Sequence, residues 1–254
     1  MSYRPEEGRI ECRQLSRLLK EIDVEIQCGI FKAKEQDLER IIESTKRYYE
    51  EIGSEYDELW YSPYAYVQYD KLYSLLQRKV SRLLSPSALI LDAGCGTCEW
   101  ATVMMKQGAL IVGFDQSLKM LQIGREKSVS QGLGQNLNLI RGDLNHLPFK
   151  EETFDGITIL FVLSHLPEYK MGNFLSELVR VTRKEGWSLV VDSRLREPHE
   201  RQELQVRTLK SGKEYIIYKR YFTAVELRTL LEKQLSRFSL ASELDRYIIC
   251  MSSP

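Results

Sequence analysis

The sequence predicts an α/β protein: a doubly wound, Rossmann-like seven-stranded sheet, with its last strand antiparallel, under an N-terminal helical cap. From residue 87 onward, short apolar runs alternate with amphipathic segments, whereas residues 1–85 contain almost no strand-like run and are dense in Glu, Lys, Arg and Tyr. Nearly continuous apolar strands between helices are typical of a parallel sheet covered on both faces. Five such runs are expected to be strands, at 88–94, 109–115, 136–143, 154–162 and 187–193.

The segment 1–85 is expected to be a helical cap. Apolar residues recur at helical spacing in two groups, Leu15, Leu18, Leu19 and Ile22, and then Leu38, Ile41 and Ile42. A third helix is expected from about residue 64 to residue 84, because Pro86 disfavours helical geometry in the residue before it. The predicted domains are therefore this cap and a core at 86–254, with an insertion on the substrate side at about 194–220.

The later part of the chain supplies the remaining elements of the core. An amphipathic stripe at 171–179 predicts a helix that is closed by the turn Lys-Glu-Gly at 184–186. The sequence Thr-Ala-Val-Glu at 223–226 matches a capping box that opens another helix. Two terminal strands are expected near 237–243 and 246–252, which completes a doubly wound sheet.

Composition limits the classes of function. The chain has 254 residues with 36 basic and 36 acidic side chains, so no net charge steers it toward nucleic acid or an anionic membrane. No apolar run approaches the roughly 20 residues of a membrane helix, and the polar start lacks the apolar centre of a signal peptide. Five irregularly spaced cysteines make a disulfide framework an unlikely pattern. We therefore expect a cytoplasmic protein.

The stretch LILDAGCGTCEWA at 89–101 admits three interpretations, because a Cys-x-x-Cys pair lies inside a glycine-rich turn. A structural zinc site needs four ligands, yet the chain has no second such pair and its three histidines are scattered. A strand-to-helix junction can hold a redox dithiol, which does not require the acid at 92 or the glycines at 94 and 96. A cofactor loop uses all of these residues.

The type of cofactor follows from charge and spacing. A dinucleotide fold favours a third glycine at position 99, which is Glu here, and Asp92 adds a second negative charge beside the loop. Such a loop suits a cationic ligand better than a diphosphate. Asp115 ends the next predicted strand, where a carboxylate can accept both hydroxyls of a ribose.

With these residues placed, residues 45–254 resemble the class I S-adenosylmethionine-dependent methyltransferases, in particular the ubiquinone/menaquinone-type group (methyltransferase type 11-like). The similar segments are LDAGCGTCEWA, GFDQS, GDLNHLPFKEETFDGITILFVLSHL, LVRVTRKEGWSLVVDS and YFTAVELRTLLEK, with YYEEIGSEYDELW upstream. The resemblance implies S-adenosylmethionine as cofactor, S-adenosylhomocysteine as product and no metal. Family members usually carry a third glycine where Cys98 stands, and a cysteine is small enough to fit under the helix there.

The resemblance also implies roles for individual residues. The glycine turn would wrap the methionine end of the cofactor, Asp115 would bind the ribose with Gln116 beside the adenosine, and Asp143 would accept from the adenine amino group. The implied cofactor-binding residues are Asp92, Gly94, Cys95, Gly96, Asp115, Gln116, Asp143, Leu144, Phe161 and Tyr49.

The expected reaction is methyl transfer to a small organic acceptor at O, N or C. In-line displacement at a sulfonium needs mainly alignment and desolvation, so the cofactor motifs identify no general base. His165, after the fourth strand of the core, and Tyr56 are the catalytic candidates. A histidine there equally suits a bond to a loop, and most of the tyrosines between 48 and 73 suit packing of the cap.

Two alternatives stay open at this point. Residues 194–220 hold eight Lys/Arg and four Glu, which fits recognition of an anionic acceptor, binding of RNA phosphates by an RNA-modifying methyltransferase, or a solvated insertion. A module that binds the cofactor without catalysis is the other alternative. The N-terminal helices are interpreted as a substrate lid, a homodimer contact or a structural cap.

Overall fold

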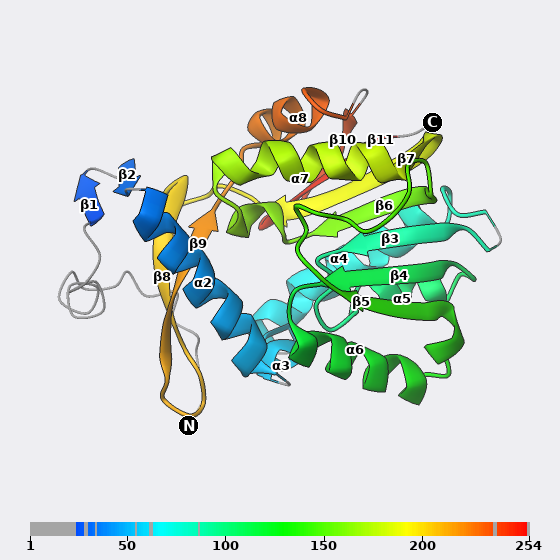
Figure 1. Cartoon of the computed structure of the whole chain (residues 1–254), viewed down its shortest axis with the longest axis horizontal. Helices are drawn as coiled ribbons and strands as arrows, with labels where there is room; N and C mark the ends of the chain where they lie inside the picture. Colours follow the sequence, from blue (N-terminus) through cyan, green and yellow to red (C-terminus); the bar gives the residue numbers. More distant parts are fainter. Residues whose placement is uncertain are drawn as a thin grey trace.

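The computed structural model describes residues 24–27, 30–33, 35–53, 55–60, 63–85, 87–235 and 238–252. Its centre is a seven-stranded sheet with the strand order β10-β11-β7-β6-β3-β4-β5 (Figure 1). These strands are β3 (Leu89–Ala93), β4 (Leu110–Asp115), β5 (Leu137–Arg141), β6 (Phe154–Leu160), β7 (Thr182–Ser193), β10 (Phe238–Glu243) and β11 (Tyr247–Ser252). Strands β3 to β7 are parallel, and the last strand, β11, is antiparallel to β7 and β10. The predicted fold class is confirmed.

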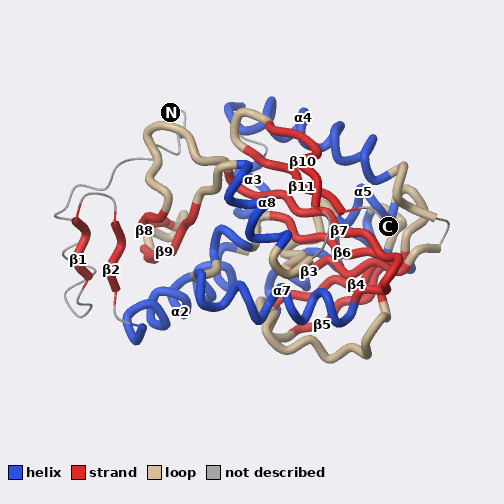
Figure 2. The backbone as a smooth tube through the Cα atoms, turned by 90° about the horizontal axis from the view of Figure 1, so that it is seen from above, coloured by secondary structure: helices blue, strands red, loops and turns tan. Residues whose placement is uncertain are grey.

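Helices cover both faces of the sheet because the inner strands are apolar on both sides. In β7, for example, Leu189 and Val191 belong to one core and Val190 to the other. The first core is covered by α4 (Pro63–Val80), α5 (Ala101–Met105) and α6 (Leu118–Ser130), and the second by α7 (Glu168–Val181) and α8 (Ala224–Glu232). Figure 2 shows α4 and α7 on opposite sides of the strands.

Two local predictions for the core have different outcomes. The capping box is confirmed, because the Thr223 side chain accepts from the Glu226 N–H while the Glu226 carboxylate accepts from the Thr223 N–H. The turn predicted at 184–186 is wrong, because α7 ends at Val181 and β7 begins at the next residue. There the Thr182 hydroxyl bonds to the Leu178 carbonyl at 2.6 Å, and Thr182 already pairs with Phe154 of β6.

The N-terminal part is helical, but it also contains strands. Helices α2 (Glu35–Ile52) and α3 (Glu55–Trp60) precede α4, and a short antiparallel hairpin of β1 (Val24–Gln27) and β2 (Ile30–Ala33) precedes them. The expectation that this part has almost no strand is wrong at 24–33. The sequence Val-Glu-Ile-Gln alternates apolar and polar residues, which is the strand period. The helix predicted around residues 15–22 lies outside the described residues.

The segment predicted as an insertion contains a second hairpin, β8 (Gln202–Thr208) paired with β9 (Glu214–Arg220). Helix α2 packs against β9 at one end of the sheet (Figure 1). A third apolar core joins them, with Tyr48 and Ile52 of α2, Met120 of α6, and Leu209, Tyr215 and Ile217 of the hairpin. This end of the sheet holds the carboxyl ends of the parallel strands. The division at residue 85 stays a prediction.

Among the described helices, none has the length and apolar content that crossing a membrane requires. The described residues also include two 3₁₀ helices, η1 (Gly134–Asn136) before β5 and η2 (Leu163–His165) after β6.

A carboxylate is buried inside the sheet, beneath its functional end. Asp92 of β3 is 2% exposed and accepts a hydrogen bond of 2.6 Å from the Thr158 hydroxyl of the neighbouring strand β6. Burial raises the pKa of Asp92 to about 7, with a further contribution from the charge of Asp115, although the bond from Thr158 opposes this. The folded protein therefore holds a proton at Asp92 over a pH range in which the unfolded chain has lost it.

This proton predicts a pH dependence of stability. Between roughly pH 4.5 and 7 the folded state binds more protons at this site than the unfolded state, so stability falls as the pH rises. The free energy of unfolding, measured by urea denaturation at a series of pH values, should fall more steeply with rising pH in the wild type than in Asp92→Asn. The two slopes should differ by up to about 1.4 kcal/mol per pH unit. The exposed Asp70, changed to Asn, is the control and should keep the wild-type slope. Parallel curves for the wild type and Asp92→Asn would contradict the assignment.

Candidate active site

The glycine turn after β3 is built from backbone conformations that favour glycine. Gly94 and Gly96 have φ of +77° and +51°, in the left-handed region. A Cβ at Gly94 would lie 2.4 Å from Cγ2 of Val162, which follows β6. The Gly94 N–H donates to the Phe114 carbonyl of β4 at 2.7 Å. The turn is therefore bonded to the backbone of β4 and packs against the Val162 side chain, with open space at Gly96.

The two cysteines of the turn pack inward. Cys95 is buried over Gly113 of β4, where an added Cβ would lie 2.9 Å from the cysteine Sγ. Cys98 has φ +58° and is buried against Gly124 of α6, at which an added Cβ would lie 2.7 Å from Sγ. The side-chain hydrogen bond with Cys98, together with burial, raises the pKa of Cys95 well above its usual value. A reactive dithiol needs a lowered thiol pKa, so this geometry disfavours the redox interpretation.

Asp115, the last residue of β4, holds the turn from the side. Its Oδ2 accepts from the Gly96 N–H and its Oδ1 from the Ser117 N–H, both at 2.9 Å. Ser117 in turn caps α6, because its hydroxyl oxygen accepts from the Met120 N–H at 3.1 Å. Burial raises the pKa of Asp115 despite these hydrogen bonds. Each carboxylate oxygen keeps a second lone pair for another donor.

A cleft opens above the turn, at the point where the strand order reverses between β3 and β6. Open α/β sheets bind their ligands at this position. Ten of the twelve predicted site residues line the cleft: Tyr49, Tyr56, Gly94, Gly96, Asp115, Gln116, Asp143, Leu144, Phe161 and His165. The other two, Asp92 and Cys95, are buried beneath it and do not line it.

The cleft also has walls that the sequence did not indicate. Helix α2 contributes Ile42, Thr45 and Lys46, and α7 contributes Lys170. A lone threonine or lysine on a polar helix carries no sequence signal for a site. The packing of α2 against β9 and α6 brings Ile42, Thr45 and Lys46 to the edge of the sheet.

The far walls come from the ends of β5 and β6. Asp143 accepts from both the backbone N–H and the side-chain amide of Asn145 at 2.9 Å, and these bonds outweigh partial burial and lower its pKa. Phe161 has φ +62°, and its ring lies between those of Trp100 and Tyr247, with centroids 5.9 and 5.2 Å away. A left-handed conformation is costly for a bulky residue, so packing on both sides holds this ring in place.

Tyr49 and His165 form a hydrogen-bonded pair at the inner end of the cleft. The Tyr49 hydroxyl lies 3.0 Å from His165 Nε2, and Nδ1 lies 3.1 Å from the Tyr218 carbonyl oxygen. A carbonyl only accepts, so Nδ1 carries the proton and Nε2 accepts from the Tyr49 hydroxyl. Burial, with the positive charges of Lys219 and Arg207, lowers the pKa of His165 well below its usual value. The imidazole is therefore neutral near pH 7.

A second cavity lies on the other side of this pair. It shares Tyr49, Tyr56, Phe161 and His165 with the first cleft, so the two spaces meet at these side chains. Its other lining residues are Tyr48, Ser193, Arg194, Arg196, His199, Arg207, Lys219, Tyr221, Arg246 and Tyr247. Six of these ten belong to the segment between β7 and α8, which includes the β8–β9 hairpin.

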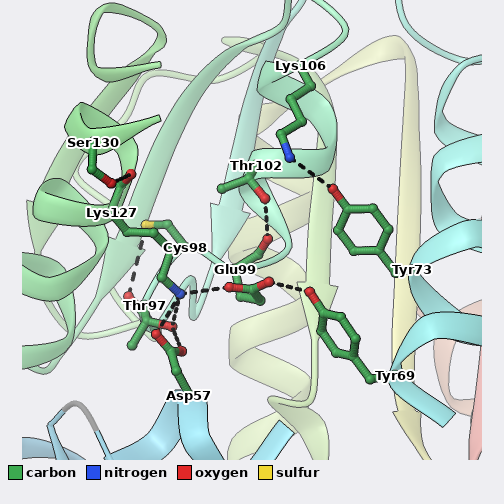
Figure 3. Close-up of polar contacts among 11 residues, drawn as sticks. Asp57, Tyr69, Tyr73, Thr97, Cys98, Glu99, Thr102, Lys106, Lys127 and Ser130 are labelled. Atoms are coloured by element: carbon green, nitrogen blue, oxygen red, sulfur yellow. Dashed lines mark hydrogen bonds and ion pairs between the residues drawn. The ribbon is translucent and has the colours of Figure 1, made fainter. Parts of the chain in front are cut away.

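A cluster of charged residues ties the glycine turn to the helices around it (Figure 3). Lys127 of α6 forms ion pairs of 2.7 Å with Asp57 of α3 and with Glu99 of the turn. Asp57 also accepts from the Thr97 hydroxyl at 2.6 Å, and Glu99 accepts from the Tyr69 hydroxyl of α4. Burial alone would lower the pKa of Lys127, but its two carboxylate partners outweigh burial and raise it. The presence of Glu99 in place of a third glycine disfavoured a dinucleotide loop. In the structure this side chain pairs with Lys127 and Tyr69.

Comparison with known proteins agrees with the methyltransferase resemblance noted in the sequence. Residues 90–186 match the family model described as a methyltransferase domain. The demethylmenaquinone methyltransferase of Geobacillus kaustophilus is 32% identical over 155 residues, which are 59% of this chain and 63% of that protein. The enzyme of the same name from Listeria monocytogenes is 36% identical over 107 residues, 41% of this chain and 44% of that protein. The chain thus spans less than two thirds of these curated relatives.

Solved structures share the fold. The DhpI–S-adenosylhomocysteine complex ("DhpI-SAH complex structure") superposes with a TM-score of 0.68 at 21% identity, over 84% of this chain and 97% of that one. The PH0226 protein of Pyrococcus horikoshii superposes with a TM-score of 0.59 at 19% identity, over 73% of this chain and 91% of that one. Residues 90–186 thus match a methyltransferase domain, and the chain shares the fold of these solved structures.

Proposed function

We propose that this protein is an S-adenosylmethionine-dependent methyltransferase that acts on a small organic acceptor. The observation that carries the proposal is the junction of two cavities, one at the carboxyl ends of the parallel strands and one beneath the β8–β9 hairpin, at Tyr49 and His165. A two-substrate reaction needs two adjoining spaces that meet where the group is transferred. The methyltransferase names of the curated relatives support the assignment.

The residues of the first cleft fit this cofactor. The free lone pairs of the Asp115 carboxylate suit the two ribose hydroxyls, and the open space at Gly96 leaves room for close approach of the methionine end. Asp143, Leu144 and Gln116 line the same cleft and would hold the adenosine part of the cofactor. The rings of Tyr49 and Tyr56, 6.0 Å apart in an edge-on arrangement, offer electron-rich faces to a cation.

When bound, S-adenosylmethionine supplies an electrophilic methyl group on a sulfonium sulfur. The protein's part is to align the acceptor with that methyl group and to exclude water, which α2 and the β8–β9 hairpin do by covering the junction. Asp115 and the glycine turn would hold this cofactor, which would supply the methyl group, and the acceptor would supply the nucleophilic atom. Where the nucleophile is a hydroxyl, its proton needs an acceptor.

The Tyr49–His165 pair can take this proton. The Tyr49 oxygen accepts the proton of the acceptor hydroxyl as Tyr49 passes its own proton to Nε2 of the neutral imidazole. Burial and neighbouring tyrosines raise the pKa of Tyr49 well above its usual value, so a free tyrosinate is disfavoured and the two transfers are coupled. The Tyr218 carbonyl, bonded to Nδ1, fixes the ring and stabilises the imidazolium that forms.

Replacement of Asp115 tests the cofactor assignment. Asp115→Ala should weaken S-adenosylhomocysteine binding by on the order of 10- to 100-fold in titration calorimetry, because it removes hydrogen bonds to a charged group and releases the Gly96 N–H. The control Asp70→Ala, on the exposed face of α4, should bind like the wild type. Unchanged affinity in Asp115→Ala would rule out this placement of the cofactor.

The proton relay predicts coupled effects of two variants. Tyr49→Phe and His165→Gln should each lower kcat for a hydroxyl acceptor by roughly 100-fold or more, with S-adenosylhomocysteine affinity within a few fold of the wild type. Because the two residues act as a unit, the double variant should be little slower than either single variant. Tyr73→Phe, which removes a hydroxyl outside both cavities, is the matched control. Fully additive losses would contradict the relay.

A further inference from the structure

We propose that Asp192 and Lys219 are positioning residues, which fix the short helix η2 so that its last residue, His165, meets Tyr49. This inference rests on the proposed methyltransferase function, because it concerns the proton relay of that same site. Both residues act on His165 through its neighbour in the chain, Ser164.

Helix η2 needs support from outside. The His165 N–H donates to the Val162 carbonyl at 3.0 Å, and the following N–H donates to the Leu163 carbonyl at 3.1 Å. Hydrogen bonds of 3₁₀ geometry are weaker than those of an α-helix, and the first N–H groups of a helix have no partner within it. The direction in which η2 presents His165 therefore depends on contacts with other elements.

Asp192, near the end of β7, holds η2 from the side of the sheet. Its Oδ2 accepts from the Ser164 N–H at 2.9 Å, and its Oδ1 accepts from the Ser193 N–H at 2.7 Å. Asp192 and Ser164 are both 0% exposed, and neither is among the described residues that line the two cavities. A buried carboxylate is costly unless donors and a positive charge compensate it. Its presence here places a strong acceptor beneath η2.

Lys219 of β9 holds the same serine from the side of the hairpin. Its Nζ donates to the Ser164 hydroxyl oxygen at 2.8 Å, and Lys219 is only 8% exposed. The hydroxyl keeps its own hydrogen for the Asp192 carboxylate, with which the serine side chain bonds. Burial raises the pKa of Asp192, although the charge of Lys219 and the bonds from Ser164 oppose this rise. The ammonium and the carboxylate thus compensate each other across Ser164.

The contacts of η2 with β9 follow one another along both segments. Ser164 bonds to Lys219, and the next residue, His165, bonds through Nδ1 to the Tyr218 carbonyl. The Nδ1 bond selects the tautomer in which Nε2 accepts from Tyr49. A displacement of η2 would therefore loosen the bonds on both sides of the imidazole. A misplacement of about 1 Å can lower a reaction rate by about 100-fold.

The test is the tautomer of His165, observed by ¹⁵N NMR of the full chain labelled at histidine, at a pH above the titration of histidine. The wild type should show one tautomer with its proton on Nδ1, and the spectrum of His165→Gln identifies the signals among the three histidines. The double variant Asp192→Leu with Lys219→Met removes both charges together, so no unpaired charge stays buried. It should lose the single tautomer, and the Nδ1 and Nε2 shifts should move toward each other.

Three further variants separate positioning from general damage. Ser164→Ala removes only the hydroxyl that joins the pair, so it is milder and should move the two shifts in the same direction. Lys219→Arg keeps a positively charged donor and should keep the wild-type tautomer. Lys71→Met removes an exposed ammonium from α4 and is the matched control. An unchanged tautomer in both Ser164→Ala and the double variant, or an equal loss in Lys71→Met, would overturn the positioning role.

Titration calorimetry with S-adenosylhomocysteine on the same samples separates this inference from the proposed function. All variants should bind it within a few fold of the wild type, because Asp192, Ser164 and Lys219 do not line the first cleft. Loss of this affinity together with the tautomer would show a general disturbance of the fold and overturn the positioning role. A wild type that binds no S-adenosylhomocysteine would refute the methyltransferase function, and the tautomer would still decide the positioning role.

Discussion

One hydrogen bond, from the Gly96 N–H to the Asp115 carboxylate, joins the ends of two neighbouring parallel strands, and the rest of the site depends on it. It holds the glycine turn in its left-handed course and leaves Asp115 with lone pairs that face the cleft. Ser117, bonded to the other carboxylate oxygen, starts α6, and Lys127 on that helix returns to the turn through Glu99 (Figure 3). The turn is thus fixed from both ends by groups that are themselves buried or paired.

The arrangement of α2 and the β8–β9 hairpin turns this edge of the sheet into two connected spaces. Tyr48 and Tyr49 occupy neighbouring positions on α2, with ring centroids 5.1 Å apart. Tyr48 packs in the apolar core with the hairpin residue Tyr215, at 5.9 Å, while Tyr49 reaches His165. The hairpin supplies the Tyr218 carbonyl, which orients the proposed relay, and it contributes Arg207 and Lys219 to the lining of the second cavity.

The sequence predicted the parts of this structure that local patterns determine. Apolar runs located the strands of the central sheet, and the glycine spacing with an acid at the end of the next strand located the cleft. The family resemblance supplied most of the ten predicted residues that line it. The sequence did not predict the contacts that depend on packing between distant segments. The approach of α2 brings Thr45 and Lys46 to the cleft, and the fold of the hairpin directs Arg207 and Lys219 into one cavity. No local spacing encodes either contact. Asp92 was expected beside the ligand, yet its bond to Thr158 keeps it inside the sheet.

The central claim is that the cofactor and the acceptor occupy two cavities that meet at Tyr49 and His165. A crystal structure of the full chain with S-adenosylhomocysteine tests this most directly. We expect the ribose hydroxyls on the Asp115 carboxylate, the adenine toward Asp143 and the sulfur facing the junction with the second cavity. A ligand bound elsewhere, or in this cleft with its sulfur directed away from Tyr49 and His165, would contradict the claim.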